Sequence, residues 1–381
     1  MGGSARNSNL HVVVIGAGVV GSSIAFNLSR RNVHVTVIDA DEPGHAASLV
    51  SFAWANARDK NPRHYHDLNR RSVDMWYRLA RRVGDSDIIT WGGEMRWSAT
   101  PEGADELRAR VKTLQSWGYP IRLLGPPEIR ALEPDLVTGE ITAASHTDIE
   151  FHVDTQAFVR ACLSKASEKG AKVVPNTRAT GLSLARGGGE TRIEAVVTDS
   201  GEFGCDVAVL AGGADTSELA AYAGLEVPFG HTFGATVLTE AVDAVFRNVA
   251  VVHTPRDRQP MMNLRQLKDG SVMIHGGSHG ADQDESMGRT DQDAEYLLES
   301  AAEYLPGLRA AKIKEVRRGR RPMPEDGHPI LGFALAVPNL YFAAMHSGVS
   351  LAALVGEFAT TEIVDGARIE VLEPFRVERF S

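Results

Sequence analysis

The sequence is poor in cysteine and has no long apolar run. Its 381 residues include only two cysteines, Cys162 and Cys205, which excludes a disulfide-stabilised scaffold and a cysteine-rich zinc site. No stretch reaches the ~18 consecutive apolar residues of a membrane-spanning helix, so no integral membrane segment is expected. The first nine residues lack the apolar core of a secretory signal and are interpreted as a polar leader outside the fold. Two reduced thiols favour a cytoplasmic protein.

Basic residues are fewer than acidic residues. Forty Lys and Arg residues against 49 Asp and Glu residues give a formal net charge of −9, which argues against a nucleic-acid partner. The 13 histidines are scattered without metal-ligand spacing, so no metal site is expected. No spacing of Ser, His and Asp indicates a nucleophilic triad. The composition, 43% hydrophobic and 23% charged, is typical of a globular protein, and the length favours two domains.

The first patterned segment predicts a nucleotide-binding unit. A β-branched apolar run at 11–15 leads into a glycine-rich turn at 16–21, a helical pattern over 22–30 and a second strand over 33–38. This order favours a dinucleotide site over a glycine-rich turn in a nucleotide-free α/β domain. The pattern by itself leaves NAD and FAD open.

Four residues of this unit have expected roles. Gly16 permits a tight turn, Gly18 lets the backbone approach a pyrophosphate, and Gly21 lets the helix pack closely on the strand. The amides at the start of the helix attract the phosphates. Asp39 ends the second strand, where its carboxylate can accept hydrogen bonds from ribose hydroxyls.

The remaining pattern predicts a discontinuous α/β protein. Residues 41–57 form a loop rich in small residues, whose two aromatics favour cofactor contact over a solvated surface loop. Residues 88–100 are expected to form a strand pair. We expect a Rossmann-type nucleotide-binding domain with an inserted α+β substrate domain that contains a large mixed or antiparallel sheet. The expected limits are 10–87, 150–225 and 321–381 for the first domain, and 88–149 and 226–320 for the second.

Four segments, in order, resemble the D-amino-acid-oxidase family of FAD-dependent amine oxidoreductases. They are the opening fingerprint with Asp39, the strand end at 209–214, the Arg-Pro segment at 321–330 and the turn and helix at 346–357. The resemblance covers almost the whole chain. It implies that FAD is bound across the first domain and that its flavin faces a sheet of the second.

The resemblance also implies which residues contact FAD. The glycine turn would hold the pyrophosphate, Asp39 the adenosine ribose, and the backbone of Val174 the adenine. The turn at Gly348 would approach the N1–C2=O edge of the flavin, where the start of the following helix stabilises negative charge. The expected contacts are Gly16, Gly18, Val19, Val20, Gly21, Asp39, Ala40, Ser48, Ser51, Val174, Gly213, Gly348, Val349 and Ser350.

Two residues are the expected substrate contacts. By resemblance, Arg321 grips the carboxylate of the substrate, a task that suits the fixed fork of a guanidinium; a structural ion pair is the alternative. His346 falls where some relatives place a basic residue near the substrate, and a histidine packed at a helix start is an equal alternative. Weaker candidates for the pocket wall are Tyr65, His253, Arg265 and His275.

Two departures from the family pattern affect the cofactor and the electron acceptor. No cysteine lies at 319–324, where sarcosine-oxidase-type members attach the flavin, so FAD is expected to be noncovalent, with His45 as a minor covalent candidate. Ser350 stands near the position of a lysine that assists the reaction with oxygen in that group. The acceptor is therefore left open between O2, as in an oxidase, and another molecule, as in a dehydrogenase.

The expected activity is oxidation of the C–N bond of an amino acid or an N-substituted glycine, by hydride transfer to flavin N5, to an imine that hydrolyses. One alternative is dehydrogenation of a hydroxy acid or a biosynthetic intermediate on the same scaffold. The other is a flavin-binding subunit of a multi-chain amine oxidase. The oligomeric state is left open.

Overall fold

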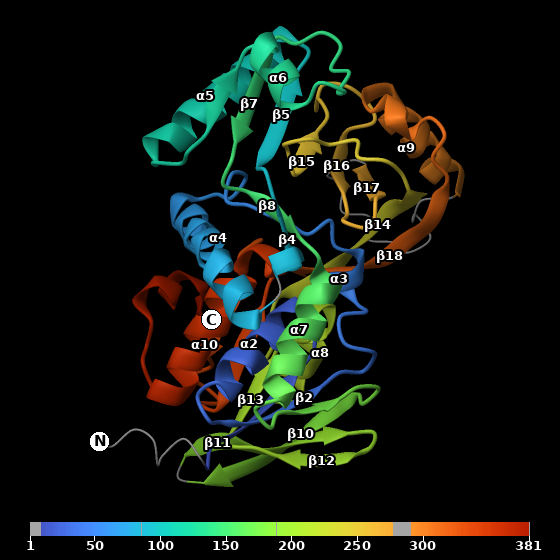
Figure 1. Cartoon of the computed structure of the whole chain (residues 1–381). Helices are drawn as coiled ribbons and strands as arrows, with labels where there is room; N and C mark the ends of the chain where they lie inside the picture. Colours follow the sequence, from blue (N-terminus) through green and yellow to red (C-terminus); the bar gives the residue numbers. More distant parts are fainter. Residues whose placement is uncertain (1–8, 85, 188, 277–290, 381) are drawn as a thin grey trace.

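The computed structural model describes residues 9–84, 86–187, 189–276 and 291–380. Two large sheets organise these residues: a six-stranded sheet in the lower half of Figure 1 and an eight-stranded sheet in the upper half. The expected α/β class with a second large sheet is confirmed. Among the described helices, none is long and apolar enough to cross a membrane.

The six-stranded sheet is built around the first strand of the chain. Its order is β19 (Ile330–Phe333), β20 (Leu340–Ala344), β13 (Val207–Leu210), β1 (His11–Ile15), β2 (His34–Ile38) and β9 (Lys172–Val174). All neighbours are parallel except β19 and β20. Val12 and Val14 belong to one apolar cluster and Val13 to another, so the sheet is buried on both faces.

Helices cover one face of this sheet and a small sheet covers the other. The helices are α2 (Val19–Ser29), α4 (Arg63–Val83), α7 (Thr155–Ser167) and α10 (Gly348–Asp365). The carboxylate of Asp154 accepts the amide of Ala157 at 2.9 Å and caps α7. The opposite face contacts β10 (Ala179–Gly187), β11 (Glu190–Thr198), β12 (Gly201–Gly204) and α8 (Thr216–Ala221).

The eight-stranded sheet is antiparallel except where β15 meets β5. Its order is β18 (Ile313–Pro324), β14 (Phe229–Ala241), β17 (Ser271–Gly276), β16 (Met262–Gln266), β15 (Val251–His253), β5 (Glu94–Ser98), β7 (Ala143–Thr147) and β6 (Arg122–Leu124). Helix α9 (Asp291–Tyr304) packs on its apolar face. Helices α5 (Pro101–Ser116) and α6 (Pro126–Leu132) lie at the top of Figure 1, beside β5 and β7.

The second face of this sheet is polar, because side chains alternate along each strand. On β16, Met262 and Leu264 belong to the apolar cluster under α9, whereas Asn263 lines a cavity on the other side. His275 of β17 stands opposite Asn263 in the register and lines the same cavity. The polar face of the sheet therefore forms a wall of the candidate site.

The expected strand pair at 88–100 is wrong. Strands β4 (Ile89–Trp91) and β5 lie in different sheets, since β4 pairs with β8 (Phe151–Val153), which also pairs with β3 (Trp54–Ala55). Gly92 and Gly93 both have positive φ, and a Cβ on Gly93 would lie 1.9 Å from a backbone oxygen of Thr147. The glycines let the chain pass close to β7 instead of forming a hairpin. Short helix α3 (Ala47–Val50) lies in the expected small-residue loop.

Candidate active site

The larger cavity has a volume of about 570 Å³ and opens at the carboxyl ends of β1, β2 and β13. This is where open parallel sheets bind ligands. It continues to the second sheet, at Gly234 of β14 and at residues 318–322 of β18. Residues of both large sheets thus face one elongated space.

The glycine turn brings the backbone to the wall of this cavity. Gly16 has φ +106°, and a Cβ there would lie 2.3 Å from the carbonyl oxygen of Ala211. A Cβ on Gly21 would lie 1.9 Å from the carbonyl oxygen of Gly16, so Gly21 permits close packing rather than ligand contact. Gly18 precedes α2 and lines the cavity, and the amide of Val19, the first residue of α2, donates to the hydroxyl of Ser48 at 3.1 Å. The amides that follow it at the helix start suit a diphosphate.

Asp39 lines the cavity and also holds the glycine turn. Its carboxylate accepts the backbone amide of Ala17 at 2.6 Å and that of Asp41 at 3.0 Å. Burial raises the pKa of Asp39, although both amide hydrogen bonds oppose this change. Each carboxylate oxygen has a second lone pair, which leaves the group able to accept from a ribose hydroxyl.

Two further turns of small residues complete the cavity, one at Gly213 and one at Gly348, the first residue of α10. The cavity wall includes most residues expected to contact FAD: Gly16, Gly18, Val19, Val20, Asp39, Ala40, Ser48, Ser51, Gly213, Gly348 and Val349. Gly21 and Val174 are not part of the wall, and the carbonyl of Val174 accepts the amide of Asp39 at 3.2 Å. Ser350 lines a second cavity. These residues fit a dinucleotide that crosses the sheet.

The second cavity, of about 280 Å³, lies between the 50–60 loop, the polar face of the eight-stranded sheet and the start of α10. It shares Gly234, Arg321 and His346 with the larger cavity. Its polar lining residues include Asp59, Lys60, Asn263, His275, Arg321 and His346. A ligand in the smaller cavity would therefore lie beside one in the larger cavity.

Arg321 lies in β18, opposite Thr232 of β14, and lines both cavities. Its Nη2 lies 3.4 Å from Nε2 of His275. The adjacent Arg320 differs in its surroundings, because it forms a 2.7 Å ion pair with Asp215. Of these two arginines, Arg321 is the one that the register of the sheet places on the face with Asn263 and His275.

His346 lies beside Arg321 but is a poor source of positive charge. Partial desolvation in the cavity wall, together with the positive charges of Lys60 and Arg321, lowers the pKa of His346, although its side chain is exposed to the cavity. The imidazole is therefore neutral at pH 7 and can act as a hydrogen-bonding group. Lys60 is a basic residue close to His346, and its Nζ donates to the hydroxyl of Ser347 at 2.9 Å.

Known proteins resemble this chain along its whole length. The model of the family described as FAD dependent oxidoreductase matches residues 11–362. The chain belongs to this family. It is 28% identical to glycine oxidase of Bacillus licheniformis over 375 residues (96% of each chain) and 26% identical to an opine oxidase subunit of Agrobacterium tumefaciens over 380 residues (97% of each). The crystal structure of glycine oxidase from Geobacillus kaustophilus matches with a TM-score of 0.83 and 22% identity, covering 97% of this chain and 99% of that one.

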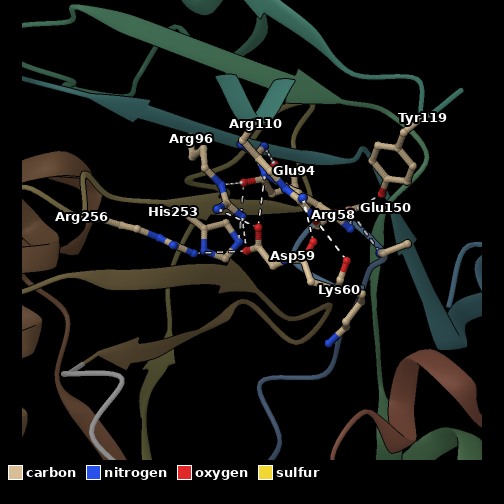
Figure 2. A network of polar contacts seen from close by, with 12 residues as sticks. Arg58, Asp59, Lys60, Glu94, Arg96, Arg110, Tyr119, Glu150, His253 and Arg256 are labelled. Carbon is tan, nitrogen blue, oxygen red and sulfur yellow. Dashed lines mark hydrogen bonds and ion pairs between the residues drawn. The ribbon is translucent and has the colours of Figure 1, made fainter. Parts of the chain in front are cut away.

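This FAD-dependent oxidoreductase has a charge cluster (Figure 2) that includes Asp59 of the smaller cavity's wall. Glu94 of β5 is fully buried and accepts hydrogen bonds from Arg58 at 2.6 Å and Arg96 at 2.5 Å. Asp59 forms ion pairs with Arg96 at 3.1 Å and with Arg256 at 3.2 Å. These arginines hold the pKa of Asp59 far below its usual range. The cluster fixes the loop that carries Asp59 and Lys60 to the second sheet.

A second buried carboxylate, Glu150, also holds this loop. It accepts hydrogen bonds from the Tyr119 hydroxyl, from the Trp54 indole at 2.8 Å, and from the backbone amide of Arg58 at 3.3 Å. Burial and the negative charge of Glu94 raise the pKa of Glu150 to about 7. Glu150 therefore titrates near neutral pH, in contrast to the strongly ionised Asp59.

Of the weaker wall candidates, only His275 lines the smaller cavity. Tyr65 does not line this cavity, but its hydroxyl lies 2.6 Å from that of Ser347, which does. Burial lowers the pKa of His253, whose ring centre lies 4.4 Å from that of Trp54 with the two planes tilted by 56°. Arg265 lies over Phe52 and donates to His152 at 2.9 Å. In the described part of the chain, no group of acidic, histidine or cysteine residues could hold a metal ion.

Sequence reasoning missed Lys60, Asn263 and the charge cluster. Lys60 and Asp59 follow the small-residue loop directly in the sequence, so the end of that loop contained a usable signal. Asn263 had no comparable signal, because a single polar residue in a strand pattern does not reveal which cavity its face of the sheet forms.

Proposed function

We propose that this enzyme oxidises the carbon–nitrogen bond of an amino acid or an N-substituted glycine. The observation that carries the proposal is the position of Arg321, on the wall shared by the cavity suited to FAD and the smaller cavity beside it. A guanidinium there can bind a carboxylate with two parallel hydrogen bonds. It would fix one end of the substrate and direct the carbon next to the nitrogen toward the larger cavity.

FAD, when bound, would supply the hydride acceptor for oxidation of the C–H bond next to nitrogen, and the resulting imine would be hydrolysed by water. The chain must then bind an amine in its neutral form. Lys60 and Arg321 favour this, since positive charges disfavour a protonated amine nearby. The start of α10, at Gly348 and Val349, offers the positive end of a helix dipole to negative charge on the cofactor.

We propose that FAD is noncovalent. Neither cysteine lines the larger cavity, and burial raises the pKa of both Cys162 and Cys205. His45 does line that cavity and would support the covalent alternative. A second candidate function, a flavin-binding subunit of a larger amine oxidase, is favoured by the similarity to the opine oxidase subunit. Turnover by the chain expressed alone would exclude it.

The test is an anaerobic screen of amino acids and secondary amines, with loss of the visible flavin absorbance as the readout. In this assay, Arg321→Ala should raise the KM of the accepted substrate about 10- to 100-fold, because a hydrogen-bonded charge contributes roughly 1.5–3 kcal/mol. FAD content should change little. Arg186→Ala on the exposed hairpin strand β10 is the matched control. An unchanged KM for Arg321→Ala would remove the carboxylate anchor from the proposal.

A further inference from the structure

Asn263 of β16 stands in a row of polar side chains that crosses the eight-stranded sheet. His253 of β15 is directly opposite it on one side, and His275 of β17 is directly opposite it on the other. Residues opposite each other in neighbouring strands share a face of the sheet, and the wall of the smaller cavity includes both Asn263 and His275. The proposed reaction does not use Asn263, so its amide is a polar group of the cavity without an assigned ligand.

The oxygen of the Asn263 amide is already hydrogen-bonded inside the protein. Nδ1 of His253 lies 2.5 Å from Oδ1 of Asn263. An amide oxygen only accepts hydrogen bonds, so Nδ1 carries the proton of the ring and donates it. The other ring nitrogen, Nε2, lies 3.8 Å from Glu94 but has no hydrogen-bond partner in the part of the chain that the structure describes. No hydrogen bond at Nε2 therefore competes for the proton.

The surroundings of His253 keep this arrangement in place. The ring is buried, its centre lies 4.4 Å from that of Trp54, and it belongs to the charge cluster of Figure 2. Burial and the positive charge of Arg96 lower the pKa of His253 to about 3, so the imidazole is neutral at pH 7. Because Oδ1 of Asn263 faces His253, the NH2 group of the amide faces away from it. Among the described residues, that nitrogen, Nδ2, has no hydrogen-bond partner.

We propose that Asn263 donates a hydrogen bond to an uncharged oxygen of the substrate, and that His253 is the positioning residue that keeps the NH2 group turned to the cavity. This inference rests on the proposed function, in which Arg321 binds the substrate carboxylate. It narrows the substrate class to amino acids that carry a carbonyl, carboxamide or hydroxyl oxygen on the side chain or on the nitrogen substituent. The amide and the imidazole behind it are both neutral, which suits a neutral oxygen, since a buried charge needs a charged partner.

The sheet also sets the distance between this oxygen and the carboxylate. Nη2 of Arg321 lies 3.4 Å from Nε2 of His275, and Asn263 is on the next strand. Neighbouring strands lie about 4.8 Å apart. The uncharged oxygen should therefore be about one strand spacing from the carboxylate, a separation that two intervening methylene groups provide.

The test compares three acids in calorimetric titrations of the FAD-loaded protein: pentanoate, levulinate and succinate. Levulinate is pentanoate with one ketone oxygen, which two methylene groups separate from the carboxylate. It should bind about fivefold more tightly than pentanoate, as expected for one neutral hydrogen bond. Succinate has a second carboxylate in place of the methyl ketone and should bind no more tightly than levulinate.

Variants assign the preference for levulinate to the two residues. Asn263→Leu should reduce the ratio of the pentanoate Kd to the levulinate Kd to about one, whereas Glu194→Leu, at an exposed position on β11, should keep the wild-type ratio. His253→Leu frees the amide to turn and should lower the ratio. His253→Asn retains an N–H group at the place of Nδ1 and should restore it. A purely structural role would change both Kd values together, and flavin content shows that each variant is folded.

The binding ratio separates this inference from the proposed function. If no amine reduces the flavin but levulinate still binds more tightly through Asn263, the proposed reaction fails and the role of Asn263 stands. Equal binding of pentanoate and levulinate by the wild type, tighter binding of succinate, or an unchanged ratio in Asn263→Leu would overturn the inference. An unchanged ratio in His253→Leu would overturn the positioning role of His253.

Discussion

The guanidinium of Arg321 lies over Gly234 of the neighbouring strand β14, which has no side chain. A Cβ on Gly234 would fall 2.1 Å from Nε and 2.2 Å from Nη2 of Arg321. Those distances are far shorter than any real contact, so the glycine leaves the space in which the guanidinium lies. Arg321 can therefore rest on the sheet and still reach the cavity beside His275.

Gly234→Ala should displace Arg321 and raise the substrate KM at least about tenfold, because the bidentate contact needs a fixed guanidinium. Steady-state kinetics with the accepted amine measures this effect. Gly230→Ala on the same strand is the control, since no atom lies within 4 Å of a Cβ at Gly230. Gly234 also lines the larger cavity, so flavin content is measured for both variants. A wild-type KM for Gly234→Ala at full flavin content would show that Arg321 does not depend on this glycine.

Some residues of the larger cavity could be predicted because they belong to one local sequence motif. Gly16, Gly18 and Asp39 belong to one continuous strand–turn–helix–strand unit, whose geometry is determined by neighbours in the sequence. Asn263 and His275 reach the cavity only because β16 and β17 pair in a particular register. A shift by one residue would turn both side chains to the other face, and the sequence pattern does not determine that register.

At the scale of elements, residues 54–60 of the 50–60 loop are held by two carboxylates, one in β5 and one just before β8. Glu94 extends from β5 and binds Arg58, while Glu150 precedes β8 and binds the Trp54 indole. Both carboxylates are fully buried, and their mutual repulsion contributes to the raised pKa of Glu150. Glu150 thus holds through hydrogen bonds the same loop that carries Lys60 to the cavity.

The raised pKa of Glu150 gives stability a definite pH dependence. Between the ordinary glutamate value of about 4.5 and the native value of about 7, the native state binds more protons than the unfolded state at this group. The free energy of unfolding should therefore fall as pH rises from about 4.5 to about 7. Above that window Glu150 should cause no further change. In Glu150→Gln this contribution should be missing, which urea unfolding at pH 5, 6, 7 and 8 would measure.

The comparison is the difference in unfolding free energy between wild type and Glu150→Gln at each pH, since other groups titrate in both proteins. Glu202→Gln, at an exposed position on β12, is the matched control and should keep the wild-type pH profile. A constant difference between wild type and Glu150→Gln from pH 5 to pH 8 would contradict a raised pKa at this carboxyl.

Elements were predictable where their periodicity was strong. The helix α2, which follows the glycine turn, has the apolar spacing of a helix in the sequence and forms where the pattern over 22–30 predicts it. The assumption that neighbouring strands pair failed at β4 and β5, which enter different sheets. Backbone contacts of Gly92 and Gly93 with distant segments at 147–148 and 248–250 determine that path. Such contacts exist only in the folded chain and leave no local pattern.

At the scale of the whole molecule, the larger cavity lies between the two large sheets. Its wall includes the turn after β1 and also residues 318–322 of β18, which belong to the eight-stranded sheet. A ligand that fills this space contacts both halves of the molecule seen in Figure 1. The limits of the two domains stay a prediction, and β18 continues through residue 321 without interruption.

Acid or denaturant should release all of the flavin into solution if it is noncovalent. Flavin retained on the precipitated chain would indicate attachment at His45.

Because the larger cavity lies between the two sheets, removal of FAD should loosen their junction more than either sheet itself. FAD added back at about a thousandfold excess over its Kd should stabilise the apoprotein by about 4 kcal/mol. Amide exchange should slow in β18 and in the turn at 16–21, because both line the cavity. Helix α5, which contributes no residue to that wall, should exchange equally with and without FAD. Equal protection of β18 in both forms would mean that the cofactor does not bridge the sheets.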